Sequence, residues 1–172
     1  MIETSYNGLR AVVTDGDIAL IGGKTNWVGK IIQRMTGSEW YHVGICFWYH
    51  GALLYIEAYP PHRRIINLSA YRHSTIGLIH TNLDDEKFNR LMDYTTKGLG
   101  SVSYGYKDLI TIWLRERVGI DLGDPKGQVC SEFVSEAMAE VGVLPRPMSV
   151  SPKQLERHLA EAGYRVTVRS DG

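Results

Sequence analysis

The sequence predicts an α+β domain in which an antiparallel β-sheet packs against helices. Strands dominate the first half of the chain, where β-branched and aromatic residues fall between glycine and proline turns. From about residue 85 onward, apolar residues recur at helical spacing instead. The 172 residues are enough for one domain with a sizeable core, and they contain no internal repeat and no linker. We therefore expect a single domain, residues 1–172, to carry one functional site.

The predicted strands follow one another through the first half of the chain. A short apolar run between turn residues gives the first strand, and a β-hairpin with a turn at His50-Gly51-Ala52 gives the next two. Two further strands follow Pro60-Pro61, which ends the hairpin. The five segments are 18–21, 42–49, 53–59, 64–68 and 76–80.

Helices are predicted where apolar residues recur every three or four positions. Ser151 followed by Pro152 marks one helix start, and Gly142 marks one helix end. Residues 119–129 are rich in glycine and read as a loop, and residues 164–168 read as a closing strand. The predicted helices are 26–35, 85–97, 107–118, 130–141 and 152–162.

Charge and hydropathy limit the classes of partner. Lys plus Arg number 19 and Asp plus Glu also number 19, so the net charge of zero favours neither a nucleic-acid partner nor an anionic membrane. No stretch of about 18 apolar residues predicts a membrane span, and the N-terminal residues do not resemble a secretory signal. We expect a soluble, cytoplasmic protein by default, with packaging in a virion or signal-independent export as alternatives.

The chain has two cysteines, and Cys130 is the better candidate for chemistry. It begins a predicted amphipathic helix and lies on the same face as the apolar residues Phe133, Val134, Ala137 and Val141. A helix N-terminus supplies unpaired N–H groups and partial positive charge, which favour a thiolate and can stabilise an oxyanion. The alternative is that Cys130 is a small buried hydrophobic residue.

His42 and Glu57 lie on the two predicted hairpin strands and are candidates for a base and its orienting group. His42 begins its strand, and Gly44 on the same face leaves room for another element to approach. Glu57 is a carboxylate in an otherwise apolar strand, where a charge requires a partner. The alternative for Glu57 is a carboxylate on an edge strand that faces water, and the alternative for His42 is a histidine at a strand end that is bonded to the backbone.

Other signals have simpler interpretations. Cys46 lies about 13 Å along the strand from His42 and reads as a packed core residue. The histidines show no recognised ligand spacing, so we expect no metal and no other cofactor. The run His62-Arg63-Arg64 is predicted to form an exposed basic turn, with anchoring of an anionic substrate as its functional interpretation.

Several motifs together resemble the circularly permuted NlpC-type papain-like superfamily, with histidine before cysteine. The most similar branch is YiiX-like and is related to lecithin retinol acyltransferase. The resemblance spans about residues 15–160 and implies a permuted papain-like fold, in which an antiparallel sheet packs against the cysteine helix. The motifs are 16–20 (GDIAL), 40–45 (WYHVGI), 55–58 (YIEA), 104–106 (YGY) and 130–134 (CSEFV).

The resemblance implies that Cys130 is the nucleophile, His42 the base and Glu57 the third member of a triad. Tyr104 is then the oxyanion candidate, although YGYK departs from the commoner spacing and Tyr106 competes with it. The candidates for lining a substrate groove are Trp40, Tyr55, Tyr106 and Ser131.

The implied activity is a thiol-dependent hydrolase of amidase or peptidase type that acts through a thioester. The partner would then be an amide- or acyl-bearing substrate, with peptidoglycan peptides and lipids among the candidates. Two alternatives remain open, a lipid acyltransferase or thioesterase of the same fold and a non-catalytic binding or inhibitory module. The sequence does not indicate the oligomeric state.

Overall fold

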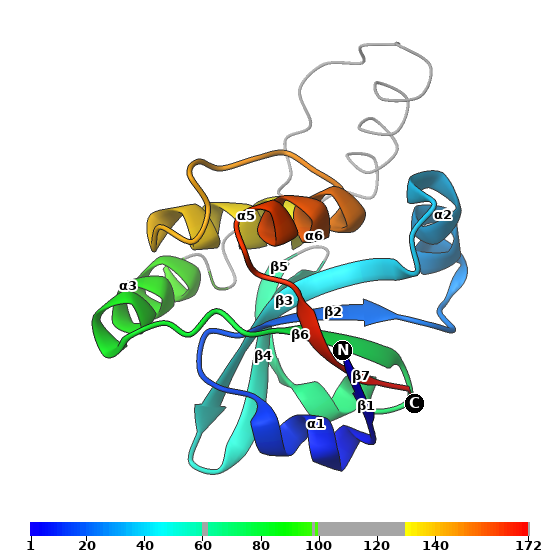
Figure 1. Cartoon of the computed structure of the whole chain (residues 1–172), viewed down its shortest axis with the longest axis horizontal. Helices are drawn as coiled ribbons and strands as arrows, with labels where there is room; N and C mark the ends of the chain where they lie inside the picture. The colour runs from blue at the N-terminus through cyan, green and yellow to red at the C-terminus, as the bar shows by residue number, and fades with distance from the viewer. Residues whose placement is uncertain (60–61, 98, 100–129, 172) are drawn as a thin grey trace.

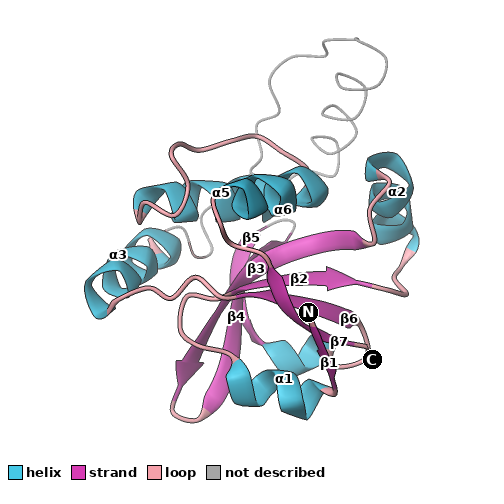
Figure 2. Cartoon of the chain, in the orientation of Figure 1, coloured by secondary structure: helices cyan, strands magenta, loops and turns pink. Residues whose placement is uncertain are grey.

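The structure is a computed structural model that describes residues 1–59, 62–97, 99 and 130–171. These residues form a mixed α+β fold with a seven-stranded sheet and five α-helices (Figures 1 and 2). The predicted α+β class is therefore confirmed. The predicted helix over 107–118 and the predicted loop over 119–129 lie outside the described residues.

The sheet is antiparallel except at one edge. The strand order is β1-β7-β6-β2-β3-β4-β5, and among these seven described strands the short β1 pairs in parallel with β7 while the other pairs are antiparallel. The central β2 and β3 are almost entirely buried, which agrees with their apolar sequences. The strands are β1 (Ile2–Thr4), β2 (Ile18–Gly22), β3 (Trp40–Tyr49), β4 (Ala52–Tyr59), β5 (His62–Asn67), β6 (Thr75–Ile79) and β7 (Val166–Ser170).

Helices cover both faces of the sheet (Figure 2). The helices α3, α5 and α6 lie on one face, and α1 lies on the other. A hydrophobic cluster fills each interface, so the sheet is the middle of three layers. No helix within the described ranges is long and apolar enough to cross a membrane. The helices are α1 (Tyr6–Val12), α2 (Trp27–Thr36), α3 (Asp85–Thr96), α5 (Cys130–Glu140) and α6 (Pro152–Glu161).

Local sequence signals account for the element boundaries that were predicted. The Ser151 side chain accepts a hydrogen bond from Gln154 N, and the Gln154 side chain accepts one from Ser151 N, which closes a capping box at α6. Asp84 caps α3 by accepting a hydrogen bond from Lys87 N. His50, with a φ of 48°, and Gly51 form the turn of the predicted β3–β4 hairpin.

The N-terminal elements β1 and α1 and the 3₁₀ turn Leu68–Tyr71 were not predicted. The strand β1 has three residues, and α1 contains Gly8 with Leu9 as its one buried residue, so neither has a clear periodic pattern. The basic turn predicted at His62-Arg63-Arg64 is wrong. These residues begin β5, and the guanidinium of Arg64 is directed at Glu57 rather than displayed on a turn.

Candidate active site

Cys130 is the first residue of α5, at the helix end where the amide N–H groups have no partner within the helix. It is 8% exposed and belongs to the hydrophobic cluster that contains Phe133, Val134 and Ala137. The predicted inward-facing position of the thiol is therefore confirmed. The positive end of the helix dipole therefore lies close to the thiol.

His42 and Glu57 lie on neighbouring strands, β3 and β4, and contact each other directly. The distance from His42 Nε2 to Glu57 Oε2 is 2.5 Å, and both side chains are buried. The pairing of β2 with β3 is irregular between Ile21 and Gly22, next to His42. Such irregularities are frequent beside functional sites.

Two further residues, which the sequence did not indicate, hold the Glu57 carboxylate. Arg64 Nε donates to Glu57 Oε1 at 2.7 Å, and Tyr71 Oη donates to Glu57 Oε2 at 2.8 Å. Arg64 lies directly across from Glu57 in the β4–β5 register, a signal that a correct strand alignment would have provided. The carboxylate is fully buried and carries three hydrogen bonds.

The pKa values of His42 and Glu57 move in opposite directions. Burial lowers the pKa of His42, but interactions with Cys130 and Glu57 outweigh it and raise that pKa to about 10. Burial raises the pKa of Glu57, but hydrogen bonds from His42, Arg64 and Tyr71 outweigh it and lower that pKa. At neutral pH the pair is therefore an imidazolium and a carboxylate.

The bonding of the imidazole assigns a role to each ring nitrogen. Nε2 is directed at Glu57, so Nδ1 is the ring nitrogen that remains for a second hydrogen bond. Both electrostatic attraction and hydrogen bonding to Cys130 contribute to the raised pKa of His42. The structure thus brings together the three residues that the sequence singled out.

Tyrosine rings surround His42 and restrict the access of water. The ring centroids of Tyr55, Tyr59 and Tyr71 each lie 6.1 Å from that of His42. The guanidinium of Arg64 stacks on Tyr59, with 3.8 Å from Cζ to the ring centroid. A dry, low-dielectric surrounding strengthens the interactions between the charged groups.

Two of the predicted groove residues are core residues in the structure. Tyr55 is fully buried, and its hydroxyl donates to the backbone oxygen of Ala19 at 3.1 Å. Trp40 is 3% exposed and packs closely over Gly22 and Gly77. Neither ring has the exposure that contact with a substrate requires.

Ser131, a predicted groove residue, is buried in the structure, whereas the oxyanion candidates are not described. Ser131 is 1% exposed, and its hydroxyl donates to the backbone oxygen of Val150, which ties the start of α5 to the segment before α6. Tyr104 and Tyr106 lie outside the described residues.

Cys46 is buried in the cluster that packs against α1, as predicted. Burial and the nearby Asp17 raise the pKa of its thiol well above the ordinary value.

The room that was expected beside Gly44 is taken by the neighbouring strand β4, because an added Cβ would lie 2.6 Å from both Ile56 O and Tyr55 Cζ.

The described residues contain no group of three or more His, Cys, Asp and Glu side chains arranged to hold a metal ion.

A second buried acid–histidine pair has a structural explanation. Asp17 Oδ2 lies 2.8 Å from His80 Nδ1, and the same carboxylate accepts hydrogen bonds from the backbone amides of Thr14 and Thr81. It therefore fastens the start of β2 to the end of β6.

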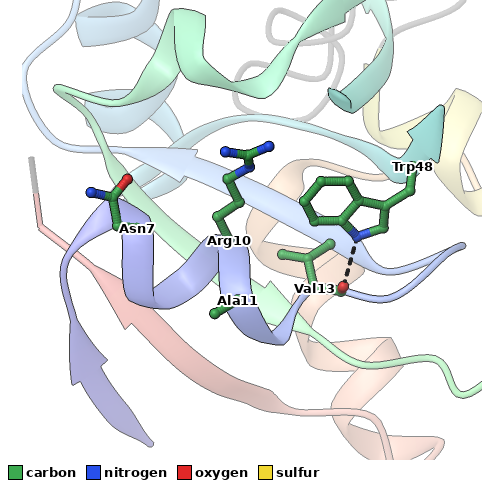
Figure 3. Close-up of a pocket in the computed structure, with 5 residues that line it drawn as sticks. All are labelled: Asn7, Arg10, Ala11, Val13 and Trp48. Carbon is green, nitrogen blue, oxygen red and sulfur yellow. Dashed lines mark hydrogen bonds between the residues drawn. The ribbon is translucent and has the colours of Figure 1, made fainter. Parts of the chain in front are cut away.

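A surface pocket of about 540 Å³ lies between α1 and β3 (Figure 3). The indole of Trp48 donates to Val13 O at 3.0 Å, and Arg10 lies 5.1 Å from its ring. Trp48 is six residues from His42 along β3, or about 20 Å at 3.3 Å per residue. The pocket is thus separate from the candidate active site.

Comparison with known proteins identifies a similar fold. The crystal structure of the metalloprotein yiiX from Escherichia coli O157:H7 matches with a TM-score of 0.52 and 17% sequence identity. The match covers 83% of this chain and 91% of that chain. No family model and no curated protein matches the sequence. At this level of identity the likeness concerns the fold alone, and the fold is YiiX-like.

Proposed function

We propose that the protein is a thiol-dependent hydrolase of amidase or peptidase type. Cys130 is the nucleophile, His42 the acid and base, and Glu57 the group that orients and charges the imidazole. The observation that carries the proposal is the buried His42–Glu57 pair, whose ionisation is coupled to Cys130 at a helix N-terminus. A purely structural histidine would not need this coupling to a thiol.

The proposed reaction has two halves. In the first, the Cys130 thiolate attacks the carbonyl carbon, and the C–S bond forms as the carbonyl electrons move to oxygen. The tetrahedral intermediate collapses, the C–N bond breaks, and the leaving amine takes a proton from His42. In the second, His42 removes a proton from water, which attacks the thioester and releases Cys130 and a carboxylic acid.

The helix end and the carboxylate have defined roles in this scheme. Backbone N–H groups at the start of α5 stabilise the negative charge that develops on the carbonyl oxygen. Glu57 keeps Nε2 of His42 protonated, so Nδ1 carries the mobile proton. Arg64 and Tyr71 fix the carboxylate and act as positioning residues.

The structural neighbour yiiX is described as a metalloprotein, which raises the question of a metal here. The described residues do not present a set of side chains that fits one. The proposed chemistry therefore uses the side chains of the triad and the backbone N–H groups of α5, with no step through a metal.

An activated ester tests the proposal without knowledge of the natural substrate. With p-nitrophenyl acetate we expect a burst of p-nitrophenolate and acetylation of Cys130, located by peptide mass spectrometry. Cys130→Ala should abolish the burst, and His42→Ala should slow it about 10²- to 10⁴-fold, the usual contribution of a general base.

Cys46→Ala is the matched control, because it removes the other thiol and should leave the burst unchanged. Acetylation at another residue, or a burst that survives Cys130→Ala, would refute the assignment. A folded protein with no acetylation at all would favour the non-catalytic binding alternative.

A further inference from the structure

The helix α2 directs apolar side chains away from the protein. Trp27 is 71% exposed and Ile31 is 46% exposed. The two residues are four positions apart and therefore lie on the same helix face. Most apolar helix faces in a globular protein point toward the core, so this outward orientation needs an explanation.

The opposite face of α2 carries polar contacts and one buried glycine. Gln33 Nε2 donates to Gly23 O at 2.9 Å and to Glu39 O at 2.7 Å. Gly29 is buried, and Asn26 caps the helix by accepting from Gly29 N at 3.0 Å. The two Gln33 hydrogen bonds tie the helix to the segments before and after it, and in this orientation Trp27 and Ile31 are exposed.

Basic residues lie beside the apolar pair. Lys24, Lys30 and Arg34 are exposed, and the sequence from 18 to 38 contains no Asp or Glu. On a helical wheel, Lys30 and Arg34 lie on one side of Trp27, and Ile31 lies on the other. The next acidic residue, Glu39, forms a 2.9 Å ion pair with Arg169. The zero net charge of the whole chain therefore conceals a locally basic surface.

We propose that this α2 face docks on a lipid bilayer that contains anionic phospholipids. Trp27 and Ile31 would enter the boundary between headgroups and acyl chains, while Lys30 and Arg34 would contact phosphate groups. Tryptophan favours this boundary because its ring is apolar and its N–H can stay hydrated. A second copy of this chain fits less well, because two basic α2 faces would repel each other.

Within the part of the chain that the structure describes, α2 lies at one edge of the fold. Among the described elements, this helix lies at the periphery, beside the ends of β2 and β3 (Figure 1). Lys153 of α6 donates to Gly37 O at 2.9 Å and fixes the C-terminal end of α2.

The docking proposal does not depend on the proposed hydrolase activity.

Vesicle flotation with the full chain tests the proposal. At low salt we expect binding to phosphatidylcholine vesicles that contain phosphatidylglycerol, weaker binding to phosphatidylcholine alone, and loss of binding at high salt. Lys30→Gln with Arg34→Gln should weaken binding about 30-fold, from roughly 1 kcal/mol per basic residue at an anionic surface. Trp27→Ser with Ile31→Ser should weaken it at least as much.

Matched controls come from other exposed surfaces. Lys87→Gln with Arg90→Gln removes the same charge from α3, and Tyr49→Ser removes an exposed aromatic ring from β3. Both should bind vesicles as the wild type does. Brominated lipids should quench tryptophan fluorescence in the wild type and much less in Trp27→Phe.

Three results would overturn the docking proposal. The first is that the folded protein does not bind vesicles, and the second is that the α2 substitutions leave binding unchanged. The third is self-association of the protein that Ile31→Glu abolishes, because that result would assign this face to a second copy. Cys130→Ala should bind vesicles normally, and the α2 variants should still be acetylated at Cys130. The two proposals can therefore fail separately.

Discussion

A carboxylate inside an apolar strand is costly unless its neighbours supply hydrogen bonds and opposite charge. Glu57 receives both, from His42, Arg64 and Tyr71. The sequence alone could indicate that Glu57 needs a partner, and the hairpin placed His42 on the adjacent strand. It could not indicate Tyr71, because that residue reaches the carboxylate from a short 3₁₀ turn whose position depends on tertiary packing.

Glu57→Gln tests the electrostatic role of the carboxylate. The substitution keeps the shape but removes the negative charge, so we expect the pKa of His42 to fall and the protein to lose about 3–5 kcal/mol of stability. Imidazole NMR titration and urea unfolding measure the two effects. Glu161→Gln, at an exposed position on α6, is the control and should change neither. An unchanged pKa of His42 would contradict the assigned pair.

Individual elements were predictable where their signals were local. The β3–β4 hairpin follows from residue composition and its turn, and the start of α6 follows from its capping box. The start of β5 is not predictable in this way because its basic residues resemble a solvated turn, whereas in the structure Arg63 and Arg64 contact Glu57 and aromatic rings. The positions of such arginines depend on the tertiary contacts of their side chains, which the local sequence does not reveal.

The close contact of β3 with β4 predicts the effect of Gly44→Ala. An added Cβ would lie 2.6 Å from the backbone oxygen of Ile56, which cannot move as a side-chain tip could. We expect a loss of about 1–3 kcal/mol in urea unfolding, the usual cost of overpacking.

Gly51→Ala separates crowding from backbone strain. Gly51 has a φ of 77° and open space around it, so this variant incurs only the strain of the left-handed conformation, about 1–2 kcal/mol. A wild-type stability for Gly44→Ala would show that β3 and β4 are not as close as described.

At the scale of the molecule, one sheet separates two hydrophobic clusters, and the candidate site lies where α5 begins above it. The sequence predicted the α+β class because hydrophobic periodicity changes along the chain. It could not predict β1 and α1, whose few buried residues gain their positions by packing against β7. The locally basic face of α2 was likewise hidden by the balanced net charge.

The raised pKa of His42 makes the stability of the whole protein depend on pH. Because the pKa is about 10 in the folded state and ordinarily 6.5, the stabilising contribution is complete below about pH 6.5. It declines as the pH rises and is lost above about pH 10. The lowered pKa of Glu57 acts in the opposite sense, and its contribution is lost as the pH falls through the folded-state value.

Urea unfolding across this range measures the His42 contribution. The stability difference between the wild type and His42→Gln should be largest near pH 6 and shrink toward pH 10. A difference that stays constant from pH 6 to pH 10 would show that His42 does not hold an additional proton in the folded state.

The most direct test of the central claim is the pH dependence of Cys130 alkylation by limiting iodoacetamide, followed by peptide mass spectrometry. If His42 and Cys130 share a proton as proposed, the wild type should react almost as fast at pH 6 as at pH 8. An ordinary thiol with a pKa of about 8.5 gains about 100-fold over that interval, and His42→Ala should behave in this way. Cys46 should stay unlabelled in the folded protein because it is fully buried. A wild-type profile that matches an ordinary thiol and coincides with that of His42→Ala would contradict the account.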